Sequence, residues 1–232
     1  MSTPDISELK RQLVSTCEAL VRSGTLSMSG HGNVSLRVPG RDEILFTAGS
    51  GLHGVTPEGI VRLRLDGSLL EGELSPTGHE VIFMHTTIYE QKDDTGCVVH
   101  THSPYATAFA VANKPIQCWS EAAARWGLDD GVPVAAYGPR GSQESLDNIR
   151  DVLTPKSKAV LLGNHGILAF GQTAQSTVGV CVALVETAQL ALYASVIGQP
   201  QVIPPHMLSY AQERMQAFAA TGAVSGGHAA NH

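Results

Sequence analysis

The feature that most constrains this chain is the stretch 97–105, Cys-Val-Val-His-Thr-His-Ser-Pro-Tyr, in which two histidines follow an apolar run. The β-branched residues of the run predict a strand. Because successive side chains of a strand point to opposite faces, His100 and His102 fall on the same face. Two imidazoles placed in this way can share one metal ion. A lone pair can equally consist of ordinary polar residues at a strand end, so a third ligand is needed before a metal site is predicted.

A third imidazole comes from the turn Gly163-Asn164-His165-Gly166, which joins two further apolar runs. Its glycines allow a sharp reversal, so His165 is expected at a strand end and not inside a core. Three protein ligands with one position left open are typical of a catalytic zinc, whereas a structural zinc is closed by four ligands, usually including cysteines. The cysteines are scattered, without any Cys-x-x-Cys pair. A catalytic site is therefore favoured.

Length and composition predict one globular domain. A chain of 232 residues can bury a substantial core, and we expect a single domain over 1–221 with a disordered tail over 222–232. The formal net charge is -6, and no long cluster of Lys or Arg occurs. Neither nucleic acid nor a membrane is therefore expected as a partner, which leaves a small-molecule substrate.

The N-terminus and the cysteines favour a cytoplasmic protein. Residues 1–5 do not contain a basic region followed by an apolar stretch, so no secretory signal is predicted. The scattered cysteines are expected to be reduced and mostly buried. The apolar run over 178–197 is interrupted by Glu186, Thr187 and Gln189, which indicates a buried or interface helix and not a membrane span.

Patterns of apolar residues predict the remaining elements. Helices are expected over 3–23, 77–89, 104–111, 142–153 and 173–197, with a short helix around Tyr210. Strands are expected over 34–38, 43–47, 61–65, 68–70, 132–136, 159–162 and 167–170. His31, His53 and His85 are expected to be loop or helix residues and not metal ligands.

Four segments give the chain a resemblance to the class II aldolase/adducin family: Gly32–Ser35, Ser75–Thr77 with Glu80, Val98–Tyr105 and Asn164–Gly166. The resemblance implies an α/β fold, a three-layer α/β/α sandwich around a mainly antiparallel sheet. It implies that His100, His102 and His165 bind a divalent metal, Zn2+ first, with Mn2+, Co2+ and Mg2+ as alternatives. It also implies a homotetramer with active sites between subunits.

The same resemblance indicates where a substrate would bind. Ser50 and Gly51, with Thr77 and Gly78, lie where the family's sugar-phosphate aldolases hold the phosphate. One hydroxyl of that pattern is missing at Gly78, and neither loop has a Lys or Arg beside it in the sequence. An unphosphorylated substrate is therefore expected. Asn33 is expected to bind the far end of the substrate.

Two glutamates are candidates for proton transfer. Glu80 lies near the family's acidic residue, a ligand or a general acid/base, although His79 could occupy that position instead. Glu121 falls where the related dehydratase has a glutamate. The tryptophans Trp119 and Trp126 are near it in sequence, which predicts an apolar setting that suits a catalytic carboxyl group. An interface carboxylate is the alternative for Glu121.

Together these features predict a metal-dependent carbon-carbon lyase. The expected enzyme is an aldolase that cleaves a small, unphosphorylated hydroxy-keto compound through a metal-stabilised enediolate. A decarboxylase of a keto or hydroxy acid on the same metal is the main alternative, and a dehydratase is related. A hydrolase would also suit the ligands. A non-catalytic adducin-like assembly module is a remote alternative, because this chain keeps all three histidines.

Overall fold

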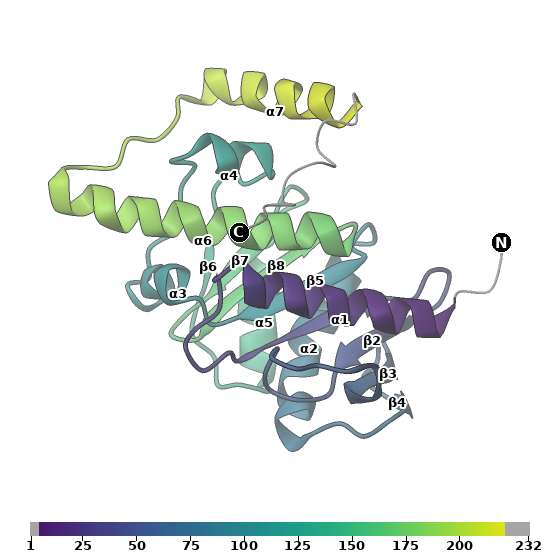
Figure 1. Cartoon of the computed structure of the whole chain (residues 1–232). Coiled ribbons are helices and arrows are strands. Elements are labelled where there is room, and N and C mark those ends of the chain that lie inside the picture. The colour runs from purple at the N-terminus through teal and green to yellow at the C-terminus, as the bar shows by residue number, and fades with distance from the viewer. Residues whose placement is uncertain (1–4, 221–232) are drawn as a thin grey trace.

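An eight-stranded sheet lies at the centre of the computed structural model, which describes residues 5–220 (Figure 1). Its strands are ordered β4-β3-β2-β1-β5-β8-β7-β6. Neighbouring strands are antiparallel except for β6 and β7, which are parallel, so the predicted mainly antiparallel sheet is confirmed. The strands are β1 (Gly32–Arg37), β2 (Glu43–Thr47), β3 (Ile60–Arg64), β4 (Leu69–Glu71), β5 (Cys97–Thr101), β6 (Val134–Ala135), β7 (Ala159–Leu162) and β8 (Gly166–Gly171).

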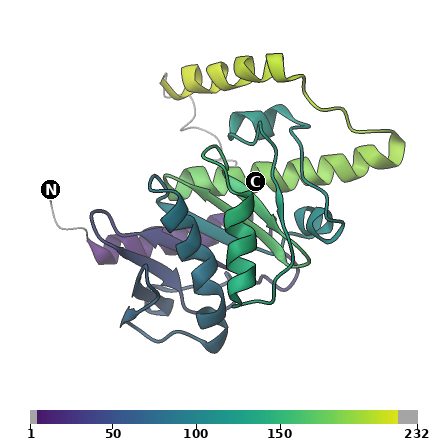
Figure 2. The ribbon, with the colours of Figure 1, turned by 180° about the vertical axis from the view of Figure 1, so that it is seen from behind.

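Helices cover both faces of the sheet. On one face, in front of the sheet in Figure 1, lie α1 (Ile6–Arg22) and α6 (Ala174–Ile197). On the other face, seen from behind in Figure 2, lie α2 (Pro76–Gln91) and α5 (Gln143–Val152). The predicted three-layer α/β/α sandwich is therefore confirmed. The other helical segments are η1 (Pro57–Gly59), α3 (Pro104–Val111), α4 (Glu121–Arg125) and α7 (Pro205–Ala220).

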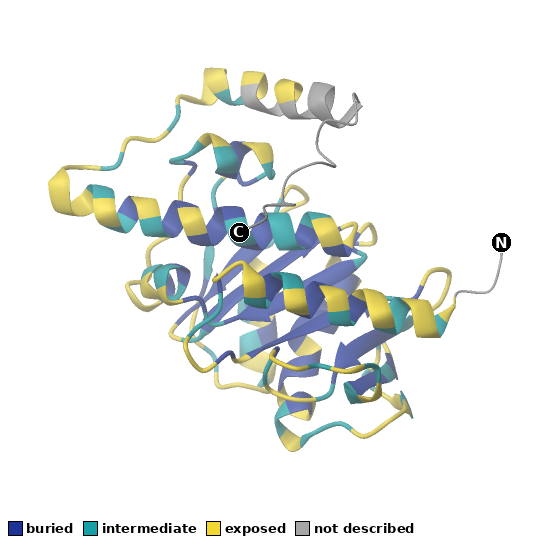
Figure 3. Ribbon diagram, in the orientation of Figure 1, coloured by how far each residue is buried: buried dark blue, intermediate teal, exposed yellow. Residues whose placement is uncertain are grey.

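Each face of the sheet has its own hydrophobic core, and the strands other than the edge strand β4 are buried along most of their length (Figure 3). Cys97 and Val99 of β5 belong to the core under α1 and α6, whereas Val98 belongs to the core under α2 and α5. This alternation is expected of a strand that is covered on both faces. His100 follows Val98 by two residues, so its side chain lies on the α2 side of the sheet.

Among the described residues, α6 is the one helix that is long and apolar enough to cross a membrane by length and composition. Its buried residues run from Ala174 to Ala191. Leu184 and Ala188 belong to the core against the sheet. The helix therefore has the buried face that the sequence predicted, as core helices of this composition do.

Two elements differ from the sequence prediction. The short helix α4 has no counterpart in the predicted elements, because five residues are too few for a helical repeat of apolar positions. The sequence feature that indicates the start of α4 is the N-cap residue Ser120, whose side chain accepts a hydrogen bond from the backbone N–H of Ala123. The helix around Tyr210 is longer than predicted. The tail expected over 222–232 lies outside the described residues.

A chain of buried polar groups connects β1 with α2. The hydroxyls of Tyr89 and Ser35 lie 2.9 Å apart, Ser35 Oγ lies 2.8 Å from His85 Nδ1, and His85 Nε2 lies 2.7 Å from Asn33 Oδ1. Burial lowers the pKa of His85 to about 3, so the ring is neutral at neutral pH. An amide oxygen can only accept, so His85 donates from Nε2 and accepts from Ser35 at Nδ1. Ser35 has then used its only proton, and Tyr89 donates to it.

This network predicts a pH dependence of stability. The folded-state pKa of His85 is about 3, against an ordinary histidine pKa of 6.5. As the pH falls below about 6.5, His85 therefore binds a proton in the unfolded chain but stays unprotonated in the folded chain. Stability from this residue is lost toward low pH, by at most about 1.4 kcal/mol per pH unit.

We expect His85→Gln to reduce that loss. The free energy of unfolding of the metal-free protein is measured with urea at about pH 7.5 and about pH 5. Its decrease between these two pH values should be up to about 2 kcal/mol larger for the wild type than for the variant. Ile88→Val, a buried α2 change without a titrating group, is the control and should keep the wild-type pH dependence. Equal losses in wild type and His85→Gln would contradict the neutral buried ring.

Candidate metal centre

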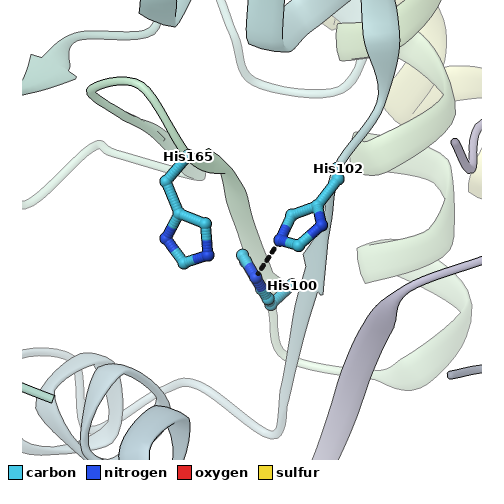
Figure 4. A group of neighbouring side chains, drawn as sticks. All are labelled: His100, His102 and His165. Atoms are coloured by element: carbon cyan, nitrogen blue, oxygen red, sulfur yellow. Dashed lines mark hydrogen bonds between the residues drawn. The ribbon is translucent and has the colours of Figure 1, made fainter. Parts of the chain in front are cut away.

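Three histidines meet where β5 and β8 pair. His100 is near the end of β5, His102 is the first residue after that strand, and His165 is in the turn between β7 and β8 (Figure 4). One nitrogen from each ring can be chosen so that all three lie within 4.8 Å of one another. His100 Nε2 and His102 Nε2 lie 3.0 Å apart. The structure thus brings together all three predicted ligands.

The backbone of β8 fixes the orientation of the most buried ring. His100 is 2% exposed, and its Nδ1 lies 2.9 Å from the carbonyl oxygen of Ile167. A carbonyl can only accept, so Nδ1 carries the proton and Nε2 keeps its lone pair toward the other histidines. A tetrahedral zinc with bonds of 2.0–2.1 Å separates its ligand nitrogens by about 3.3 Å. The rings therefore fit a metal of this kind.

The surroundings keep the three rings neutral, which is the form that binds metal. Burial lowers the pKa of His100 well below its ordinary value, and the neighbouring His165 and His102 add to the effect. Burial, then the nearby His102 and Arg140, lowers the pKa of His165 to about 4. Burial, then His31 and Arg140, lowers the pKa of His102.

The turn that carries His165 depends on two small or flexible residues. Asn164 has a φ of +56°, in the left-handed region that asparagine tolerates better than most residues. Gly166 lies against both other histidines: a Cβ there would be 2.6 Å from the carbonyl oxygen of Thr101, 2.8 Å from His102 Cδ2 and 3.3 Å from His100 Cε1. The close approach of the rings therefore requires a glycine at this position.

A cavity of about 160 Å³ opens beside the histidines. Of the predicted substrate-binding residues, Asn33, Ser50, Thr77 and Gly78 line it. Gly51 does not line it, but pairs with His31, which does. Because His85 occupies the amide oxygen of Asn33, the amide NH2 group is available as a donor. The predicted binding residues are thus gathered next to the metal centre.

A larger hollow, of about 700 Å³, lies between α1 and the start of α6. Its charged residues, Glu8 and Arg11, form an ion pair with each other. It contains none of the predicted ligands or substrate-binding residues. The smaller cavity at the histidines is therefore the candidate active site.

Arg140 also lines the cavity, which the sequence analysis missed. The expectation that no Lys or Arg compensates the binding loops is therefore wrong. Arg140 lies about 60 positions after Glu80 in the chain, and only the packing of its loop beside the N-terminus of α2 brings the two together. The sequence feature that could have indicated Arg140 as a binding residue is its position as a cation in the glycine-rich segment 138–142.

The two predicted proton-transfer residues have different surroundings. Glu80 is half-exposed and does not itself line the cavity, but its Oε2 lies 2.6 Å from Nη2 of Arg140, which does. Glu121 does not line the cavity, and its side chain is 72% exposed and paired with Arg125. The apolar setting expected for Glu121 is therefore wrong for the single chain. Its carboxylate faces outward although Trp119 and Trp126 pack against the core.

Comparison with known proteins gives the family. Residues 11–192 match the model of the Class II Aldolase and Adducin N-terminal domain. Since this match covers most of the chain, the protein belongs to the class II aldolase/adducin family. The resemblance carried by the four sequence segments is thereby confirmed.

Two relatives that cover most of the chain are named as aldolases. The chain is 28% identical over 213 residues to the 5-deoxy-D-ribulose 1-phosphate aldolase of Bacillus thuringiensis serovar kurstaki, a match that covers 90% of this chain and 96% of the relative. It is 31% identical over 179 residues to the L-fuculose phosphate aldolase of Methanococcus maripaludis, covering 77% and 93%. These relatives support a lyase of the aldolase class.

Solved structures agree with this assignment. An L-fuculose 1-phosphate aldolase superposes with a TM-score of 0.80 at 27% identity, covering 93% of this chain and 100% of the other. An aldolase II superfamily protein from Pseudomonas syringae has a TM-score of 0.76 at 20% identity, covering 93% and 87%, which shows the shared fold.

The position of Gly166 leads to a prediction about metal affinity. Gly166→Ala places a Cβ against Thr101 and both neighbouring imidazoles, so the rings must separate. We expect zinc affinity to fall at least ~10-fold, the size of effect seen when groups that orient ligands are disturbed. Competition against a chromophoric chelator measures this, with circular dichroism to verify folding.

Gly59→Ala serves as the matched control, because a Cβ at Gly59 meets nothing within 4 Å. This variant should bind zinc as the wild type does. An unchanged zinc affinity in folded Gly166→Ala would show that the three rings do not form the metal site.

Proposed function

We propose that the protein is a divalent-metal-dependent aldolase that cleaves a carbon-carbon bond of a small hydroxy-keto compound. The observation that carries this proposal is the group of three neutral imidazoles beside a cavity lined by Asn33, Ser50 and Thr77. Zn2+ is the proposed ion because nitrogen ligands in an open three-residue site suit it, with Mn2+, Co2+ or Mg2+ as alternatives.

His100, His102 and His165 would hold the ion, and neutral ligands leave its positive charge uncompensated. When bound, the ion supplies Lewis-acid chemistry: it polarises substrate oxygens and stabilises the negative charge that develops as the carbon-carbon bond breaks. The Ile167 carbonyl keeps His100 in the correct tautomer for this role. The protein thereby presents the three ligands where paired strands end, with His100 on β5, His102 just after it and His165 in the turn before β8.

Further substrate contacts come from other residues that line the cavity. The amide NH2 of Asn33 and the hydroxyls of Ser50 and Thr77 can bind substrate oxygens. Thr77 and Gly78 are in the first turn of α2, where the helix dipole favours negative charge. These groups suit a polyhydroxylated compound with an anionic end.

The nature of that end separates two versions of the proposal. An unphosphorylated substrate was expected because no cation stood beside the binding loops in the sequence, and Arg140 removes that reason. The names of the relatives given above refer to sugar phosphates. A phosphorylated hydroxy-ketone and an unphosphorylated hydroxy-keto acid are therefore both proposed substrates.

Glu80 is the proposed general acid/base within the chain, since its carboxylate pairs with Arg140, a residue that lines the cavity. Glu121 could serve this function only at the site of another subunit, because it is exposed and does not line the cavity of its own chain. His79 is exposed in the first turn of α2 and stays the alternative to Glu80.

Decarboxylation is the second candidate, and Arg140 is the observation that favours it. A guanidinium in the cavity suits the carboxylate of a keto or hydroxy acid. The same ion would stabilise the charge left when carbon dioxide departs. An adducin-like assembly module is disfavoured, because a non-catalytic protein has no need of three converging imidazoles.

A homotetramer with active sites between subunits is also proposed, in the cytoplasm. Large apolar side chains are exposed along the end of α6 and on α7: Leu190, Tyr193, Val196, Ile197, Met207 and Tyr210. Exposed apolar surface of this extent supports burial against another subunit. Such an interface would also bring α4 and its Glu121 near a second chain.

A product assay tests the function. The zinc-loaded protein is incubated with hydroxy-keto acids, ketoses and ketose phosphates, and both carbon dioxide and carbonyl fragments are recorded. We expect carbonyl fragments without carbon dioxide, and activity that disappears on chelation and returns with zinc. Carbon dioxide without a second carbonyl fragment would establish the decarboxylase instead.

Removal of one ligand gives the matched comparison. His165→Ala should reduce turnover by more than ~10²-fold, since even partners of metal ligands contribute up to that factor. His206→Ala, which changes an exposed histidine of α7, should retain wild-type turnover. Full activity of the metal-stripped His165→Ala protein would contradict the metal-dependent mechanism.

A further inference from the structure

We infer that Arg140 determines substrate specificity by binding an anionic group of the substrate, and that this group takes the place of Glu80 on the guanidinium. The inference rests on the proposed function and specifies the chemical class of its substrate. The ligand chemistry is a carboxylate or a phosphate, both of which accept parallel hydrogen bonds from a guanidinium.

Arg140 lines the same cavity as the groups that would hold the rest of the substrate. It lines the same cavity as His102 and His165, and the same cavity as Ser50 and Thr77. Among the cavity-lining residues that the structure describes, it is the only lysine or arginine. A substrate oxygen at the histidines and an anion at Arg140 can therefore belong to one small molecule.

The loop that carries Arg140 is held in place on both sides. Gly138 lies so close to α5 that a Cβ there would be 2.6 Å from the backbone of Ser145. A Cβ at Gly141, which has a φ of +78°, would be 3.5 Å from the Cα, Cβ and carbonyl oxygen of Glu80. Ser142 donates its backbone N–H to the carbonyl of Pro139 at 3.0 Å and caps α5. The guanidinium is thus presented from a fixed turn.

Glu80 shows that an oxyanion fits the guanidinium. Its Oε2 lies 2.6 Å from Arg140 Nη2, and both side chains are about half-exposed. Exposed ion pairs of this kind contribute little to stability, so a substrate anion can displace the carboxylate readily. A guanidinium has five N–H donors, and the single carboxylate oxygen of Glu80 does not occupy all of them. Displacement would also release Glu80 to accept or donate a proton.

The exchange predicts opposite effects for the two partners. Arg140→Met removes the anion-binding group, whereas Glu80→Gln removes the competing charge. Binding is measured by isothermal titration of the metal-free protein with inorganic phosphate and, separately, with pyruvate as a carboxylate probe. Arg140→Met should weaken the preferred probe about 10- to 100-fold, the effect of losing a hydrogen bond to a charged group. Glu80→Gln should bind that probe at least as tightly as the wild type.

Arg11→Met is the matched control. Arg11 also pairs with one carboxylate at 2.6 Å on an exposed surface, but lies outside the cavity. It should leave both affinities unchanged. Arg140→Lys, which keeps the charge and loses the planar fork, should give an intermediate affinity. Arg140 is exposed enough that none of these changes is expected to prevent folding, which circular dichroism verifies.

The outcomes separate this inference from the proposed function. Preference for phosphate or for pyruvate identifies the anion, and binding of either probe supports the role of Arg140 when Arg140→Met weakens that binding about 10- to 100-fold. Binding of both probes to Arg140→Met within a few-fold of wild type, or no binding of either probe to the wild type at millimolar concentration, overturns the inference. Because these measurements do not use turnover, they hold whether or not the aldolase assay succeeds.

Discussion

The candidate site depends on the antiparallel pairing of β5 with β8. In this register Thr101 lies opposite Ile167 and His100 lies opposite Leu168. The pairing brings the end of β5, with its two histidines, against the turn that carries His165. It also places the Ile167 carbonyl where His100 Nδ1 can donate to it. A shift of the strand register by one residue would turn His100 to the opposite face of the sheet and separate it from His165.

The rest of the molecule supports this pairing from both sides. The core under α1 and α6 holds Val99, and the core under α2 and α5 holds Val98. β1, which pairs with the other edge of β5, places Asn33 directly opposite His100. Asn33 is in turn fixed by His85 of α2. His100 and Asn33 are therefore held by strand pairing and buried hydrogen bonds.

Local patterns predicted the strands and placed His100 and His102 on one face, whereas the family resemblance joined His165 to them as the third ligand. Alternation in 97–102 was sufficient to place His100 and His102 on one face, and the glycines around His165 indicated a turn. The ion pair between Glu80 and Arg140 could not be predicted in this way, because it joins segments far apart in the chain through the packing of one loop. The apolar setting of Glu121 was inferred from sequence neighbours, and neighbouring residues on a short helix point in different directions. The family resemblance supplied the order of the layers, which local patterns do not determine.

The most direct test of the central claim is the coordination of the bound metal. Zinc-loaded protein is examined by X-ray absorption in solution and by anomalous diffraction from crystals. We expect one zinc per chain, with nitrogen neighbours at 2.0–2.1 Å from His100, His102 and His165 and oxygen in the remaining positions. Sulfur neighbours near about 2.3 Å, or zinc bound away from these three histidines, would contradict the assignment of the site.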